Sequence, residues 1–286
     1  MMAGEKIFVY MGGSQFVPYD TERARIHHSV TAVAAGAFRN RRQLISVEFH
    51  ARIELIEEDA FRGCPLKGCL FLEGVTIVKK HAFSGCAFTI IKLPAVTRIL
   101  WGAFCKCHEL QDVQFGSGLE TIEGFALFDC PKLKRVSLPL LSIPDGVFTC
   151  SSELARIDVA GGIQQTVASL HNDSWSKDMN HEINQINQLL TTRGRFDKQY
   201  VVQNWMRNVM IKLNQYKAKH LEQLREASTV LELALWKANL DDNGGGKLAC
   251  KVVQTRGGRK KARMDTRVTA GADIVIKNVL SFLQLA

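Results

Sequence analysis

Cysteine is the residue type whose spacing in this chain could most directly support chemistry. Cys64, Cys86, Cys107 and Cys130 recur at steps of 22, 21 and 23 residues. A regular fold that brings thiols together can form disulfides or bind a metal ion. Free cysteine also packs as a small apolar side chain. We expect these four thiols to be buried, small hydrophobic groups that fill the same place in successive structural units.

Other patterns typical of catalysis or metal binding are incomplete. Cys105, Cys107 and His108 cluster locally but lack the second pair that a zinc site needs. The eight histidines form no H-E-x-x-H pattern, and no G-x-S-x-G occurs. The glycines before Lys247 have Asp241 where a P-loop begins with Gly. We predict no enzymatic activity, no metal, no cofactor and no small-molecule substrate.

A repeat of about 22 residues positions the cysteines. A small residue followed by an aromatic or aliphatic one recurs at Ala37-Phe38, Ala60-Phe61, Ala82-Phe83, Ala103-Phe104, Ala126-Leu127 and Val147-Phe148. Each copy continues into a run such as Leu110-Val113-Phe115, and the second copy fits more loosely as Leu66-Cys69-Phe71. One unit of this length cannot bury its apolar face, so the pattern predicts stacked units.

The repeats predict an α+β chain that begins with a parallel-sheet solenoid. Residues 88–107 and 133–150 match most of the unit L-x-x-I-x-L-P followed by L-x-x-I-x-x-x-A-F-x-x-C. The sequence here resembles the BspA-like leucine-rich repeats. We assign about six repeats to residues 26–162, after an N-terminal cap segment at 1–25. The first and last copies depart from the pattern, with Arg41 and Ser151 in the cysteine position.

Residues 163–286 predict an all-α, basic domain. Trp175–Leu190 carries apolar residues at helical spacing, and no Pro or Gly interrupts Lys198–Asn239. The glycines at 244–246 suggest a flexible loop near 241–268. The apolar residues of the long segment suit either core packing or a coiled-coil dimer seam. The apolar segment Asp273–Leu285 is expected to be buried against the other helices.

This second half carries a further resemblance. The segments VASLHNDSW, VLELALWKANL, RGGRKKAR and VTAGADIVIKNVLSFLQL resemble a large family of unicellular algae. In that family a BspA-like solenoid precedes the same helical tail. The resemblance implies an architecture for the whole chain, and it implies no particular activity.

The outward strand positions of the solenoid give the first functional hypothesis. One expected column is Glu48, Leu70, Lys92, Gln114, Ser137 and Asp158, and its neighbour is Ser46, Gly68, Ile90, Asp112, Arg135 and Arg156. A face for a repetitive anion would be uniformly basic, whereas these columns mix charges and sizes. We predict a non-catalytic scaffold that binds one or more proteins through the concave sheet.

The charge distribution gives the alternative. Residues 1–160 hold 18 Lys+Arg and 17 Asp+Glu, whereas residues 161–286 hold 19 and 11, a net charge of +8. Much of this charge lies in segment 256–267, through Arg256, Arg259, Lys260, Lys261, Arg263 and Arg267. This segment suits a solvated loop, a nuclear address or a nucleic-acid contact. The alternative hypothesis is a nuclear or nucleic-acid-associated factor anchored there.

The expected compartment follows from apolar runs. Ile7–Met11 is too short for the apolar region of a secretory signal. The sequence has no run of 18 apolar residues. We therefore expect a cytoplasmic or nuclear protein that is not secreted and has no transmembrane segment or membrane partner.

Overall fold

A computed structural model of the chain describes residues 7–160, 173–192 and 198–243, with side chains described for 7–160, 177–192 and 198–233. The described helices are α2 (Asp173–Thr192) and α3 (Lys198–Asn243). The strands are β1 (Ile7–Tyr10), β2 (Arg23–Ile26), β3 (Ala32–Val33), β4 (Ser46–Glu48), β5 (Leu55–Ile56), β6 (Cys69–Phe71), β7 (Ile77–Val78), β8 (Ile90–Leu93), β9 (Arg98–Ile99), β10 (Asp112–Phe115), β11 (Thr121–Ile122), β12 (Arg135–Leu138) and β13 (Arg156–Val159).

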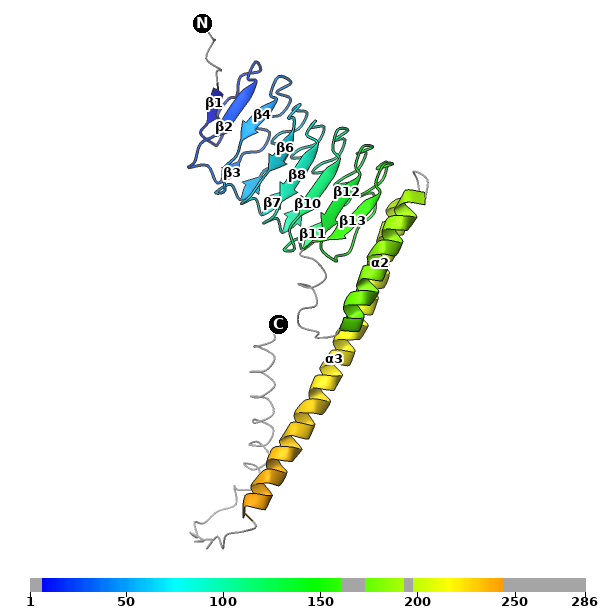
Figure 1. The fold of residues 1–286 in the computed structure, drawn as a ribbon. Coiled ribbons are helices and arrows are strands. Elements are labelled where there is room, and N and C mark those ends of the chain that lie inside the picture. The colour runs from blue at the N-terminus through cyan, green and yellow to red at the C-terminus, as the bar shows by residue number, and fades with distance from the viewer. Residues whose placement is uncertain (1–6, 161–172, 193–197, 244–286) are drawn as a thin grey trace, which may run out of the picture. The chain divides into compact units, whose positions relative to one another are not determined.

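The strands form a solenoid of parallel sheets (Figure 1). The longer strands run in the orders β1-β2-β4 and β6-β8-β10-β12-β13, and the two-residue strands run β3-β5-β7-β9-β11. The backbone N–H of Lys67 donates to the carbonyl of Ile45 at 3.0 Å, which links the coil of β4 to that of β6. The predicted parallel-sheet solenoid of about six 22-residue repeats, followed by helices, is confirmed.

Phenylalanines form the centre of the solenoid. The rings of Phe38, Phe61, Phe83 and Phe104 stack one per coil, with centroids 4.9, 5.2 and 5.7 Å apart and planes within 12° of parallel. All four side chains are fully buried. The Ala-Phe pairs of the sequence therefore mark one inward column, in which each coil covers the apolar face of the next.

The cysteine position forms a second inward column. The thiols of Cys64, Cys86, Cys107 and Cys130 donate to the carbonyls of Phe38, Phe61, Phe83 and Phe104 in the preceding coils, at 2.8, 3.2, 3.2 and 3.3 Å. All four are buried and free, as expected for small core residues. Burial raises the pKa of Cys64 to about 12, and it raises the pKa of the other three as well.

Strand β6 differs from the expected register. Leu70 pairs with the inward Ile91 and is only 8% exposed, whereas Phe71 pairs with the outward Lys92 and is 53% exposed. The prediction that Leu70 faces outward is therefore wrong. The coil has one more residue between Leu66 and β6 than the run L-x-x-C-x-F suggested, and Gly68 in this segment has a φ of +80°. A slip of one residue exchanges the two faces of a strand.

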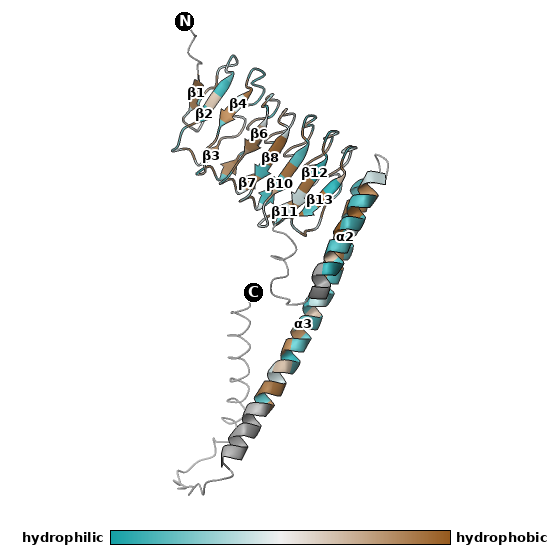
Figure 2. Cartoon of the chain, viewed as in Figure 1, coloured by the Kyte–Doolittle hydropathy of each residue, from teal (hydrophilic) through white to brown (hydrophobic). Residues whose placement is uncertain are grey.

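Helices α2 and α3 follow the repeats. The expected helix at Trp175–Leu190 lies within α2, and the uninterrupted segment from Lys198 forms α3. Figure 2 shows apolar and polar residues mixed along both helices. Their buried apolar side chains are Met179, Ile186, Leu190, Val202, Trp205, Met206, Val209 and Leu213. Neither described helix is both long and apolar enough to cross a membrane.

The packing units differ from the expected boundary at residues 162 and 163. Among the described residues, 7–160, 173–192 and 198–212 form one compact unit, and 213–243 belong to a second. Strands β1 and β2, which begin before residue 26, pair in the solenoid sheet. The solenoid unit therefore includes strands from the expected cap segment, together with α2 and the beginning of α3. The expected loop from residue 244 onward and the segment Asp273–Leu285 lie outside the described residues.

Side chains of these helices cover the last coil. Asn187 of α2 accepts from the backbone N–H of Ile157 at 2.8 Å and donates to the carbonyl of the same residue at 3.3 Å. It thus pairs with the edge of β13 as a further strand would. Lys198 donates to the carbonyls of Ser152 and Leu154 at 2.7 and 2.6 Å. The contacts with Ile157 and Ser152 satisfy backbone groups that a following repeat would otherwise pair, and the Leu154 carbonyl also gains a donor.

At the other end of the solenoid, the edge strand is covered by a side chain from the first coil itself. Gln15 accepts from the backbone N–H of Met11 at 2.5 Å and donates to the carbonyl of Val9 at 3.4 Å. Tyr10, between these two residues, offers its carbonyl to His27 in the next coil. Since neighbouring residues of a strand point their backbone groups to opposite sides, Gln15 covers the outer edge of β1.

Candidate functional site

The longer strands of the two sheets, β1-β2-β4 and β6-β8-β10-β12-β13, present a set of outward side chains, which we call the outer strand face. Its first column is Arg25, Glu48, Phe71, Lys92, Gln114, Ser137 and Asp158, and its second is Arg23, Ser46, Cys69, Ile90, Asp112, Arg135 and Arg156. The register brings together every expected position except Leu70 and Gly68, which Phe71 and Cys69 replace. The face is therefore polar and mixed in charge, with one exposed aromatic ring at β6.

Polar contacts within the face link side chains on neighbouring strands and along one strand. Glu48 accepts from Arg25 Nε at 2.5 Å, and this hydrogen bond lowers the pKa of Glu48. The carboxylate of Asp112 accepts from Gln114 Nε2 at 3.0 Å through one oxygen, and its buried Oδ1 has no hydrogen-bond partner. Charges on this face are thus arranged in local groups rather than as one field of a single sign.

The most concentrated group lies on β12 and β13. Arg135 Nε donates to Asp158 Oδ2 at 2.6 Å. Arg156 Nε donates to both oxygens of the same carboxylate, at 2.9 and 3.2 Å. Two guanidinium groups therefore share one carboxylate, and one positive charge is not neutralised within this group.

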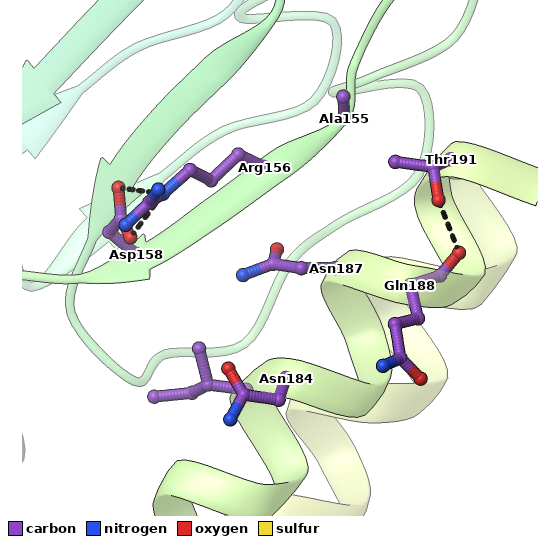
Figure 3. Close-up of a pocket in the computed structure, with 8 residues that line it drawn as sticks. Ala155, Arg156, Asp158, Asn184, Asn187, Gln188 and Thr191 are labelled. Atoms are coloured by element: carbon purple, nitrogen blue, oxygen red, sulfur yellow. Dashed lines mark hydrogen bonds and ion pairs between the residues drawn. The ribbon is translucent and has the colours of Figure 1, made fainter.

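A groove lies beside this group, between β13 and α2 (Figure 3). Its volume is about 450 Å³, and its described lining is Ala155, Arg156, Asp158, Ile183, Asn184, Asn187, Gln188 and Thr191. In Figure 3, Asn187 extends from the helix toward the strand, where it holds the backbone of Ile157. Thr191 donates its hydroxyl to the carbonyl of Gln188 at 2.7 Å.

The side-chain amides of Asn184 and Gln188 are the uncommitted polar groups of the groove. Both residues are exposed on α2. Neither side chain has a hydrogen bond to any residue of the described chain. An amide of this kind can donate and accept at once, which suits a peptide main chain or a carboxylate. The groove thus combines a positive charge with two free amides over the partly buried side chains of Ala155 and Ile183.

The strand side and the helix side of this groove differ in how far the sequence predicts them. Arg156 and Asp158 were predicted from the repeat register, whereas Asn184, Asn187, Gln188 and Thr191 were not. Their signal is a row of polar residues at steps of three and four within α2. Such a row is typical of a solvated helix face, and only packing against β13 gives it a role.

A second exposed feature lies on the turns beside the short strands. The rings of His81, Trp101, Phe125 and Phe128 are in contact in that order, with centroids 4.7, 5.5 and 5.4 Å apart. Phe125 has a φ of +60°, a conformation that bulky residues rarely adopt. Gly146 leaves room for its ring, since a Cβ there would lie 2.9 Å from it. These four rings, which we call the aromatic ladder, link three successive coils.

Next to this ladder, Cys105 and His81 lie within reach of each other. The Cys105 thiol is 3.6 Å from His81 Nδ1 and 3.1 Å from the Ser84 hydroxyl. Burial lowers the pKa of His81, which disfavours the imidazolium that would stabilise a thiolate. Among the residues that the structure describes, no three His, Cys, Asp or Glu side chains are grouped as metal ligands. The basic residues of segment 256–267 lie outside the described residues.

Comparison with known proteins bears on the repeats. The family described as "BspA type leucine rich repeat region (6 copies)" matches residues 8–89 and 76–189. Among solved structures, a leucine-rich cell surface protein from Faecalibacterium prausnitzii is 19% identical, with a TM-score of 0.25. That match covers 51% of this chain and 62% of the other, less than two thirds of its length. No curated protein matches the chain.

Proposed function

Since this chain belongs to the BspA-type leucine-rich-repeat family, we propose that it is a non-catalytic scaffold that binds a partner protein through the outer strand face. The observation that carries the proposal is the register of β6 to β13. It places seven polar or charged side chains in two unbroken columns, namely Lys92, Gln114, Ser137, Asp158, Asp112, Arg135 and Arg156. Glu48 extends the first column on the neighbouring sheet.

The composition of the face favours a protein partner. Positive and negative groups are mixed along it, and the exposed ring of Phe71 offers an apolar anchor. Protein interfaces combine such an anchor with a polar rim whose charges select the partner. A scaffold of this kind needs a rigid surface more than a reactive group, and the stacked coils supply the rigidity.

The test is a comparison of partner retention by three full-length baits in extract from the source organism. The first is the unchanged chain, and the second carries K92E and Q114K at the centre of the face. The control carries R98E and E120K, which change exposed charges beside the short strands. We expect partners to be lost from the face variant alone. Partners held equally by all three baits would contradict the proposal.

The alternative function rests on the basic segment 256–267. We infer that this segment would direct the chain to the nucleus or hold nucleic acid, since it accounts for much of the +8 charge after residue 160. Binding to phosphates releases counterions and therefore weakens steeply with salt. A full-length K260A/K261A/R263A variant should then lose nuclear location and DNA retention. Unchanged behaviour of that variant would exclude the alternative.

A further inference from the structure

We propose that the groove between β13 and α2 binds an acidic peptide segment of a partner protein, with a carboxylate held by Arg156 and Arg135. The inference rests on the proposed function, because it takes the outer strand face as the surface that partners approach. It adds a subsite that the repeats alone do not form. Five of the eight described lining residues belong to α2, among them Asn184, Gln188 and Thr191.

The net charge of the two arginines and their shared carboxylate indicates which chemical group they would bind. Arg135 and Arg156 face the single carboxylate of Asp158, so the three side chains sum to one positive charge. Asp112 is the register neighbour of Arg135 on the adjacent strand β10, but its carboxylate forms no ion pair with Arg135, and it lies two strands, about 10 Å, from Arg156. A second carboxylate would complete the group, whereas a phosphate of about −2 charge would exceed it. The match is therefore to Asp, Glu or a C-terminal carboxylate.

Exposure keeps the guanidinium groups available. The side chains of Arg135 and Arg156 are 46% and 62% exposed, whereas that of Asp158 is 20% exposed. Both arginines reach Asp158 through Nε. Arginine carries further N–H donors on its two terminal nitrogens, which allow it to hold two acceptors at once.

The helix side supplies contacts for a peptide main chain. The free amides of Asn184 and Gln188 lie one helical turn apart on α2, beside the partly buried Ile183. Asn187, which lies between them in sequence, already pairs in this way with the backbone of Ile157. A bound segment would thus run beside α2, with its backbone on the amides and its carboxylate on the arginines.

The probe is a fluorescein-labelled dodecapeptide of alternating Glu and Ser with an amidated C-terminus, titrated against the full chain by fluorescence anisotropy. We expect R156E to weaken its binding at least about fivefold, because an attraction becomes a repulsion. The matched control R98E changes the net charge equally and should have less than about a twofold effect. Titrations in a K260A/K261A/R263A background remove binding by segment 256–267.

Asp158 gives the sharper test, because its removal should have the opposite sign. D158N frees both arginines from their internal carboxylate, and the affinity for the acidic peptide should rise about two- to fivefold. A merely structural role for Asp158 predicts a loss instead. Equal effects of R156E and R98E, or weaker binding by D158N, would overturn the inference.

Further peptides distinguish a side-chain carboxylate from a C-terminal one. Together with the partner-retention test, they also distinguish the groove inference from the proposed function. A Gln-Ser peptide with a free C-terminus tests a terminal carboxylate, and the same peptide amidated should not bind. A phosphoserine peptide of equal charge that binds more tightly than the Glu peptide would overturn the carboxylate assignment. If partner retention depends on Lys92 and Gln114 while the acidic peptide does not bind, the groove inference fails and the proposed function stands. If R156E weakens peptide binding while the face variant retains all partners, the groove inference stands and the proposed function fails.

Discussion

The interior coils of the solenoid and its two end coils satisfy equivalent backbone groups with different chemistry. In the interior, each thiol from Cys64 to Cys130 donates to a carbonyl of the preceding coil. In the first copy Arg41 Nε donates to Val17 at 2.7 Å, and in the last copy Ser151 donates to Leu127 at 3.3 Å. The hydrogen bond to the preceding coil is therefore retained in the two copies that lack the cysteine.

A repeat unit therefore has its backbone groups paired by other repeats only where it has a coil on each side. An interior coil is hydrogen-bonded to a coil on each side, whereas β1 and β13 each leave an edge that no further coil covers. Gln15 covers one edge from within the first coil. Residues from α2 and α3 cover the other. The last coil thus depends on elements that lie outside the repeat, and this dependence also creates the groove.

The largest effect should come from the interior. Replacing Phe83 with Ala removes a ring stacked between two others, and it should lower the free energy of unfolding by about 3–5 kcal/mol. Phe71→Ala is the matched control, because its ring is exposed and its loss should cost about 0.5 kcal/mol. Urea unfolding measures both. Comparable losses would mean that the two faces of the strands are assigned the wrong way round.

The C-terminal end should show the next largest effect. Lys198→Ala removes two short hydrogen bonds from an ammonium group and leaves the carbonyls of Ser152 and Leu154 without their donor. We expect a loss of about 2–3 kcal/mol in the free energy of unfolding. Lys177→Ala on α2 changes the same residue type at an exposed position and serves as the control. A negligible loss at Lys198 would show that the last coil does not need this cover.

We expect alkaline pH to destabilise the interior coils, which carry the buried cysteines, more than the two end coils. Burial raises the pKa of Cys64 from 9.0 to about 12, so above pH 9 the unfolded thiol ionises while the folded one keeps its proton. Stability is therefore full below pH 9 and falls above it, by about 1.4 kcal/mol per pH unit for each such thiol. The last copy has Ser151 in the same position, and a serine hydroxyl does not titrate in this range.

Cys64→Ser should make this fall shallower, as followed by thermal unfolding between pH 8 and 10. In the folded chain at pH 8, an alkylating reagent should modify the exposed Cys69 and Cys150 before the buried column. Rapid modification of Cys64 or Cys107 would contradict the burial on which the pH dependence rests.

The N-terminal edge should show the smallest effect. Gln15→Ala removes two hydrogen bonds that are exposed to water, so the backbone groups of Val9 and Met11 can turn to solvent instead. We expect a loss of about 0.5 kcal/mol or less in the free energy of unfolding. Asn187→Ala is the comparison at the other end, and it should cost more because its contact is partly buried. A larger loss at Gln15 would reverse the contrast between the ends.

The solenoid was predictable from the sequence alone, because the same inward pattern recurs six times. Any one copy is ambiguous, but the Ala-Phe and cysteine positions agree across copies and so fix the stacking. The outward columns followed from the same register, including Arg135 and Arg156. The error at Leu70 arose where a single coil has an extra residue, and Cys69 could pass for an inward residue because it is small and apolar.

The residues that cover the end coils and line the groove could not be predicted from the sequence, because their contacts depend on tertiary packing. Asn187 and Lys198 lie 30 and 44 residues from the backbone groups of Ile157 and Leu154 that they contact. No local pattern connects such positions, since a polar residue on a helix face reads as solvent-exposed until its partner is known. The pairing depends on α2 packing against β13, and that packing places two free amides beside two arginines.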